Sequence, residues 1–147
     1  GETSAQLGDT LIAREHAGGG FALTAGDLDG DGVPEWAIGA PQTGVVRIVR
    51  ATGDPVGTLT GTGRFGAALS MADIDGDGRA ELLVGAPRAN SDAGEAILYG
   101  SDLAERERIA GDPGDRLGTS VALGAGGLLL GAPGGPDGVG AVVWQQD

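Results

Sequence analysis

The segment Asp73-Ile74-Asp75-Gly76-Asp77-Gly78-Arg79-Ala80-Glu81, which runs directly into the apolar stretch Leu82-Leu83-Val84, is the part of this sequence that decides its fold. Its carboxylates stand at positions 1, 3, 5 and 9, and its two glycines permit a tight backbone curl that turns them toward one centre. Hard oxygen donors at this density repel one another, and Ca²⁺ resolves that repulsion because it takes about 6–8 oxygen ligands in a flexible geometry. A carbonyl at position 7 and water would complete such a shell. The alternative for a single copy is a solvated acidic turn, since Asp and Gly are common turn residues.

A second copy of this loop, Asp27-Leu28-Asp29-Gly30-Asp31-Gly32-Val33-Pro34-Glu35, stands 46 residues earlier and matches it position for position. The repetition favours a metal site over an ordinary turn. An EF-hand is the competing motif, and it needs a bidentate Glu at position 12 and a helix on each side. Position 12 is Ile38 in the first loop and Val84 in the second, both within segments that read as strands. We therefore predict two calcium-binding loops that are not EF-hands.

The whole chain follows the same period. Gly-Ala-Pro occurs three times at intervals of 46 residues, beginning at Gly39, Gly85 and Gly131. Similar short segments stand near the start of each unit: Phe21-Ala22-Leu23, Phe65-Gly66-Ala67 and Leu117-Gly118-Thr119. Such self-similarity is typical of stacked or radially arranged structural units.

Each unit is predicted to consist of short β-strands. Alternating or apolar runs are separated by turn residues, helical periodicity is absent, and the 31 glycines would destabilise helices. The segments 55–60 and 103–110 read as a fourth, more polar strand in the first two units. Charges in the second of these interrupt any apolar face, as expected of an edge strand. Four short strands in roughly 40–50 residues is the size of a propeller blade, so the fold class is all-β.

Phe65-Gly66, the Asp-rich loop and Gly85-Ala86-Pro87 together resemble the FG-GAP repeat, the blade unit of the integrin α-subunit β-propeller and of many bacterial surface proteins. The resemblance extends over nearly the whole chain as three units. It implies a single all-β propeller domain over residues 1–147, made of three four-stranded blades. The expected blades are residues 21–61, 65–110 and 117–145.

In that family the loop between the first and second strands binds Ca²⁺, which implies two Ca²⁺ sites in this chain. The implied ligands are the four carboxylates of each loop and the main-chain carbonyl at position 7: Asp27, Asp29, Asp31, Val33 and Glu35, and Asp73, Asp75, Asp77, Arg79 and Glu81. The third unit departs from the pattern, because Gly124-Ala125-Gly126-Gly127 has no acidic residue. We expect a short turn and no metal there. The Phe-Gly pair also varies, with Phe21-Ala22 in the first unit and Leu117-Gly118 in the third.

The third unit ends after its third strand, whereas the chain begins with a spare one. Residues 9–15, from Asp9 to Glu15, precede the first unit and are predicted to complete a last blade whose other strands are C-terminal. Three blades are too few for a ring, since propellers have about 4–8. We expect two chains to join as a homodimer and form a six-bladed ring, because two-fold symmetry is the commonest oligomer arrangement. The alternative is a fragment, or an engineered repeat, of a longer propeller.

The composition limits the partners and the location. With 9 basic and 21 acidic residues the net charge is −12, and no Lys/Arg cluster is present, which argues against nucleic acid and anionic membranes. There is no cysteine, so disulfides and thiolate metal sites are excluded. No apolar run has the length of a membrane span, and no signal peptide is visible in this chain. The family resemblance implies an extracellular or cell-surface location, in a bacterial protein.

No catalytic set is apparent in the sequence. His16 is the only histidine, and nothing brings a particular serine to it, as a catalytic triad would require. We therefore expect a protein that is not an enzyme but a calcium-binding propeller module for extracellular protein interaction or scaffolding, with structural Ca²⁺. Its ligand would be a protein or a glycan. The alternative is a lectin-like or enzymatic propeller with its site at the mouth of the ring.

Overall fold

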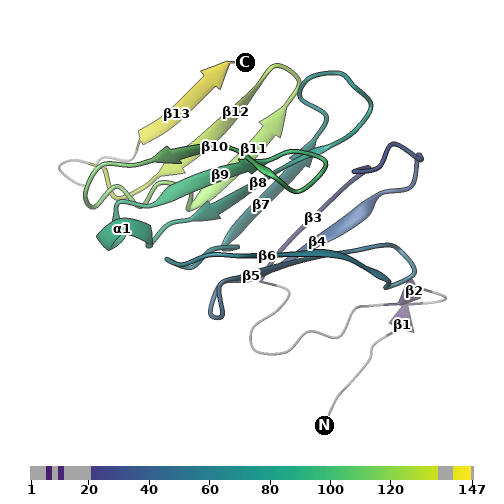
Figure 1. Cartoon of the computed structure of the whole chain (residues 1–147). Helices are drawn as coiled ribbons and strands as arrows, with labels where there is room; N and C mark the ends of the chain where they lie inside the picture. The colour runs from purple at the N-terminus through teal and green to yellow at the C-terminus, as the bar shows by residue number, and fades with distance from the viewer. Residues whose placement is uncertain (1–5, 8–9, 12–20, 136–140, 147) are drawn as a thin grey trace, which may run out of the picture.

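The computed structural model describes residues 6–7, 10–11, 21–135 and 141–146. This part of the chain is all-β, with antiparallel sheets that follow one another along the sequence (Figure 1). Each sheet is a simple meander, so neighbouring strands in the sequence are neighbours in the sheet. The fold class predicted from the strand periodicity is confirmed at this level.

The first two large sheets have four strands each. The first sheet has the order β3-β4-β5-β6 and comprises β3 (Ala22–Gly26), β4 (Glu35–Ala40), β5 (Val45–Val49) and β6 (Pro55–Thr60). The second has the order β7-β8-β9-β10 and comprises β7 (Ala68–Ala72), β8 (Glu81–Ala86), β9 (Glu95–Tyr99) and β10 (Glu105–Ala110). A short segment, α1 (Ala89–Asp92), joins β8 to β9. The charged strand β10 lies at the edge of its sheet.

The third sheet has three strands among the described residues. They are β11 (Ser120–Gly124), β12 (Gly127–Ala132) and β13 (Ala141–Gln146), in the order β11-β12-β13. Gly124 pairs with Gly127 across a two-residue turn. The short turn expected in place of an acidic loop is therefore present.

The N-terminal segment forms a small hairpin in the part that the structure describes. β1 (Gln6–Leu7) pairs with β2 (Thr10–Leu11) as a two-stranded sheet. Of the strand predicted at residues 9–15, only Thr10 and Leu11 fall within the described residues. Its pairing with the last sheet stays a prediction.

The sheets stack face to face through two apolar clusters. In the first, residues of the first sheet such as Val46 and Ile48 pack against Leu82, Val84 and Ile97 of the second. In the other, the opposite face of the second sheet packs on the third, with Leu83, Ala96 and Leu98 against Leu117, Leu128, Leu130 and Ala132. Every residue of β8 and β9 is buried, because the second sheet is covered on both faces. The strand β7 contacts β3 on one side and β11 on the other, so the first strands of the three sheets lie in a row (Figure 1).

The glycine of Gly-Ala-Pro is required by this stacking. A Cβ on Gly39 would overlap the carbonyl oxygen of Gly66, and a Cβ on Gly85 would overlap that of Gly118. Gly66 and Gly118 have φ of 90° and 87°, a region that side chains other than glycine rarely adopt. The glycine of one Gly-Ala-Pro thus receives the main chain of the next unit's Phe-Gly or Leu-Gly pair. This contact explains why the two motifs occur together.

The register corrects one sequence alignment. Ala22 pairs with Gly39 and Ala68 pairs with Gly85, so Ala22 is the equivalent of Ala68. The structural equivalent of Phe65, three residues before Ala68, is therefore not Phe21. Phe65 is 1% exposed and packs edge-on against Tyr99, whereas Phe21 is 61% exposed. Sequence similarity aligned Phe21 with Phe65, but the strand pairing makes Phe21 the equivalent of Ala67.

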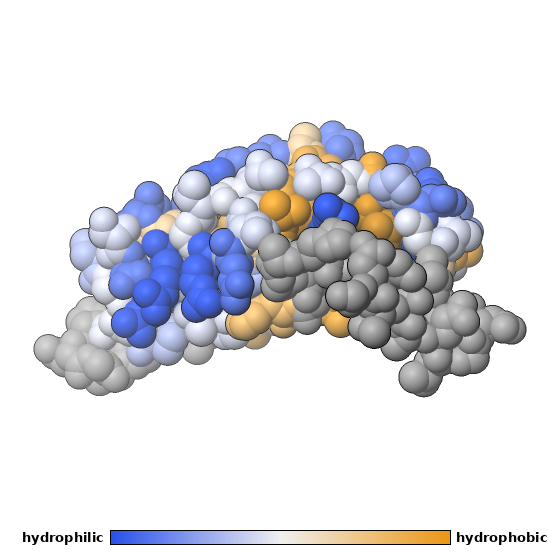
Figure 2. Space-filling model, turned by 90° about the horizontal axis from the view of Figure 1, so that it is seen from below, coloured by the Kyte–Doolittle hydropathy of each residue, from blue (hydrophilic) through white to orange (hydrophobic). Residues whose placement is uncertain are grey.

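Some large apolar side chains remain at the surface. They are Phe21, Leu23, Val33, Trp36, Val56 and Leu129. Seen from below the view of Figure 1, the molecule has a curved outline, and hydrophobic groups reach its surface in the middle, between hydrophilic regions (Figure 2). Leu23 and Trp36 lie on the same face of the first sheet, because Leu23 pairs with Ile38 and Ala25 with Trp36.

We expect Gly85→Ala to lower the free energy of unfolding by about 3 kcal/mol, the upper end of the range for overpacking, because main chain cannot rotate away from the added methyl group. Urea unfolding followed by circular dichroism measures this change. Gly124→Ala is the matched control, since a Cβ there meets no atom within 4 Å and the change should stay within about 1 kcal/mol. Equal losses in the two variants would contradict the proposed role of the glycine contact.

Candidate metal centre

Both Asp-rich loops join the first and second strands of a sheet. The first loop connects β3 to β4, and the second connects β7 to β8. In each, the residue before position 1 pairs with the Glu at position 9: Gly26 with Glu35, and Ala72 with Glu81. Antiparallel pairing therefore returns the glutamate to the beginning of its own loop, where the first aspartate lies.

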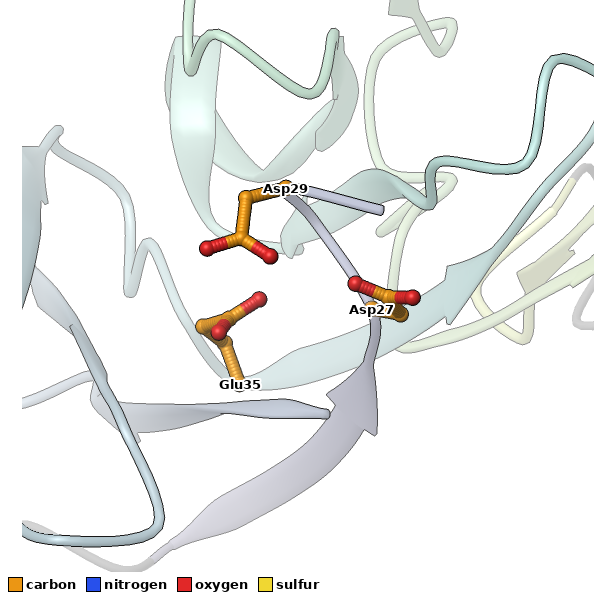
Figure 3. A group of neighbouring side chains, drawn as sticks. All are labelled: Asp27, Asp29 and Glu35. Carbon is orange, nitrogen blue, oxygen red and sulfur yellow. The ribbon is translucent and has the colours of Figure 1, made fainter. Parts of the chain in front are cut away.

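Three carboxylates gather in each loop. Oxygen atoms of Asp27, Asp29 and Glu35 all lie within 4.8 Å of one another, and their carboxyl groups surround a common space (Figure 3). Asp73, Asp75 and Glu81 form the same group in the second loop. These six residues are among the ligands predicted from the sequence. The structure brings them together from the loop and from the first residue of the following strand.

The aspartate at position 5 lies outside each group of three. Asp31 Oδ1 accepts a hydrogen bond of 2.7 Å from the Val33 N–H, and Asp77 Oδ1 accepts one of 2.8 Å from the Arg79 N–H. These aspartates support the turn through their own local bonds. Their coordination of a metal, and that of the Val33 and Arg79 carbonyls, stays a prediction.

The aspartate at position 1 organises the loop backbone. Asp27 accepts N–H bonds from Gly30 at 2.7 Å and from Gly32 at 2.8 Å. Asp73 accepts the equivalent bonds from Gly76 at 2.7 Å and from Gly78 at 2.9 Å. The Gly78 N–H in particular holds the pKa of Asp73 below its usual value, despite the opposing effect of desolvation. Asp73 is therefore ionised at neutral pH, as a metal ligand must be.

The glutamate at position 9 is buried. Glu35 is 2% exposed and Glu81 is 0% exposed, although each begins a strand of an apolar core. Glu35 Oε2 accepts a 2.8 Å bond from the Leu28 N–H, and Glu81 Oε2 accepts a 3.0 Å bond from the Ile74 N–H. Burial raises the pKa of Glu81, and the nearby Asp75 and Asp77 charges add to that rise. A cation between these groups would reverse both effects.

An arginine reaches each group, which sequence reasoning did not identify. Arg50 Nη1 lies 3.1 Å from Asp29 Oδ2, and Arg106 Nη1 lies 3.4 Å from Glu81 Oε1. Arg50 follows β5, which pairs with β4, whereas Arg106 belongs to β10, which is separated from β8 by β9. The only sequence signal is a basic residue in a predicted strand or directly after one. It becomes informative once the order of the strands is known.

The two loops are also joined to each other. The Ala80 N–H of the second loop donates a 2.7 Å hydrogen bond to the Asp27 carbonyl of the first. Ala80 and Leu28 are both buried and belong to the apolar cluster between the first two sheets. Each carboxylate group therefore lies against the packing between sheets.

The donor chemistry fits a hard cation such as Ca²⁺. Each group offers carboxylate oxygens, with no histidine or cysteine among its members, so zinc lacks the nitrogen and sulfur ligands that it prefers. Carboxylates on a short loop suit the flexible oxygen geometry of Ca²⁺ better than the strict octahedron of Mg²⁺, which usually retains several waters. The residues present therefore fit the ion implied by the sequence.

We expect Asp73→Asn, measured with chelator present, to lower stability at neutral pH and to lose this effect in acid. A carboxyl whose pKa is lower in the folded chain stabilises the fold above its unfolded pKa, about 4, and loses that contribution as the pH falls through the folded pKa. Urea midpoints of both proteins at pH 7, 5 and 3 measure this convergence. A difference that widens toward pH 3 would contradict it.

A comparison with protein families bears on the second unit. The model described as the FG-GAP repeat matches residues 65–99. The matched span covers Phe65-Gly66, β7, the second Asp-rich loop, β8 with its Gly-Ala-Pro, α1 and β9. No match was found among curated proteins. The resemblance inferred from the motifs is thus confirmed for this unit, because residues 65–99 match the FG-GAP repeat.

Proposed function

We propose that this chain is a calcium-binding module of the β-propeller type, in which each ion holds the first hairpin of a unit to its neighbour. The observation that carries the proposal is the convergence of three carboxylates in two equivalent loops, each including a buried glutamate. A bound cation would remove repulsion among these groups and compensate the buried charge. The role of Ca²⁺ would be structural.

The proposed location is outside the cell or on its surface. FG-GAP repeats are typical of extracellular proteins, and the described residues contain no helix long and apolar enough to cross a membrane. The Ca²⁺ sites of extracellular modules can be as weak as about 10⁻⁴–10⁻³ M, and a site of that affinity here would be filled in millimolar calcium. We propose a role in protein interaction or scaffolding, without catalysis.

The free face of the first sheet supports a proposal about the partner. Leu23 and Trp36 on this face are 60% and 43% exposed. Their equivalents 46 residues later are Leu69 and Leu82, which lie in the packed interface between the first and second sheets. The free face of the first sheet therefore corresponds to the face of the second sheet that the first sheet covers.

The opposite end of the stack carries the complementary surface. Ala37 and Leu83 lie on the faces that cover the next sheet, and both are buried. Their equivalent in the third sheet is Leu129, which is 40% exposed. We propose that the third sheet of a second copy covers the first sheet, in the way that each sheet covers the next within one chain. Two chains would then supply six blades, a number that closes a propeller ring.

Calcium should raise the melting temperature. At a Ca²⁺ concentration ten times the dissociation constant, each site adds about 1.4 kcal/mol, which corresponds to several degrees. Differential scanning calorimetry in excess Ca²⁺ and in chelator measures the shift. Asp75→Ala should reduce it, whereas Asp102→Ala, in a turn outside both loops, should preserve it. Identical melting with and without Ca²⁺ would exclude the proposed function.

Self-association should depend on the free face of the first sheet. We expect light scattering to give the mass of two chains for the unmodified protein and of one chain for Trp36→Glu, because a carboxylate cannot be buried in that interface without a partner. Ala51→Glu is the control, since Ala51 is exposed in the turn between β5 and β6, outside the strands of that face, and the change should not affect the mass. If the unmodified protein has the mass of one chain over about a 100-fold range of protein concentration, a second copy does not cover the first sheet.

A further inference from the structure

Each carboxylate group pairs with a guanidinium through the same two loop positions. Arg50 Nη1 lies 3.1 Å from Asp29 Oδ2 and 3.7 Å from Glu35 Oε1. Arg106 Nη1 lies 3.5 Å from Asp75 Oδ2 and 3.4 Å from Glu81 Oε1. Positions 3 and 9 therefore share one arginine in each loop. These are also two of the three positions that converge as candidate metal ligands.

The two arginines come from positions that are not equivalent. Val49 pairs with Trp36, and Tyr99 pairs with Leu82, so the residue after Val49 corresponds to the residue after Tyr99. These residues are Arg50 in the first unit and Gly100 in the second.

The second unit supplies its arginine from the next strand. In the first sheet Pro55 pairs with Val49 and Gly57 with Ile48, which leaves Val56 as the extra residue of a bulge. In the second sheet Glu105 pairs with Tyr99 and Glu107 with Leu98, which leaves Arg106 as the extra residue, so Arg106 is the equivalent of Val56. The pair Arg50 and Val56 in the first unit is thus replaced by Gly100 and Arg106 in the second.

Gly100 has no side chain and so leaves room for the side chain of Arg106. A Cβ on Gly100 would meet Arg106 Cζ and Nη2 at 2.9 Å. The Arg106 side chain therefore crosses the place where the Arg50 side chain begins in the first unit. Simple duplication would have kept the arginine at one position. Instead, a guanidinium reaches positions 3 and 9 of each loop from two positions that are not equivalent. We take this as a sign that these carboxylates need a positive charge beside them.

We propose that Arg50 and Arg106 are tethered cations that weaken metal binding at their loops and stabilise the metal-free fold; this inference rests on the calcium-binding function proposed above. A metal ion bound by Asp75 and Glu81 shares those carboxylates with a guanidinium, and the two positive charges repel each other. Without a metal ion, the same guanidinium compensates the buried Glu81. The arginine therefore reduces the difference in stability between the metal-bound and the metal-free protein.

The test is calcium titration of Arg106→Met by isothermal calorimetry, in a protein whose first loop is silenced by Asp27→Asn. We expect Ca²⁺ to bind about tenfold more tightly than in the same protein with Arg106, while the melting temperature in chelator falls. Arg106→Lys should give intermediate values, since lysine keeps the charge without the planar guanidinium. Arg88→Met removes one positive charge at an exposed position beside α1 and should leave the affinity unchanged.

The opposite signs of the two effects distinguish this role from others. An ion pair that only supports the fold would lower the melting temperature in chelator and leave the calcium affinity unchanged, which would overturn the proposal. An arginine that helps to orient the ligands would give weaker binding when removed, which would also overturn it. If Arg106→Met does not fold, Arg50→Met with the second loop silenced by Asp73→Asn gives the same test.

The outcome also separates this inference from the proposed function. If the protein with Arg106 binds no Ca²⁺ and melts alike with and without it, the calcium-binding function fails and this inference fails with it. If that protein binds Ca²⁺ but Arg106→Met binds it no more tightly, only the role of the arginine is excluded.

Discussion

The buried glutamates Glu35 and Glu81 determine how each Asp-rich loop folds and what charge must lie beside it. A carboxylate within an apolar core is strongly destabilising unless hydrogen bonds and opposite charge compensate it. Each glutamate begins the central second strand of its sheet, so the preceding loop must fold back to supply a main-chain N–H, from Leu28 or Ile74. The same folding brings two aspartates beside the glutamate, and the requirement for positive charge then becomes larger.

Two sources of positive charge are available to these groups. One is an arginine from elsewhere in the same sheet, and the other is the cation proposed above. Both act at positions 3 and 9 of the loop, so they compete electrostatically while serving the same need. Because Ala80 of the second loop is hydrogen bonded to Asp27 of the first, a change at either loop also acts on the packing between sheets. A metal ion at the surface of the loops would in this way stabilise the stack as a whole.

The stacking itself is set by main-chain contacts between glycines. Gly39 and Gly85 allow the next unit to approach so closely that even a methyl group would overlap its backbone. Leucine, isoleucine and valine side chains then fill the remaining space between sheets. Since the same contacts recur from unit to unit, the exposed faces at the two ends carry the corresponding residues, such as Trp36 and Leu129.

The all-β class, the strands and the loop carboxylates could be predicted from the sequence, because they depend on local patterns: alternation, turn residues and ligand spacing within nine residues. It also identified the FG-GAP repeat later matched at residues 65–99. The three-dimensional arrangement was needed to show that Asp31 and Asp77 lie outside the groups of three, and that Phe65 and Phe21 are not equivalent. It alone placed Arg50 and Arg106 beside their carboxylates. Those contacts join residues on separate strands, and their distances are set by sheet order and register, which no short stretch of sequence specifies.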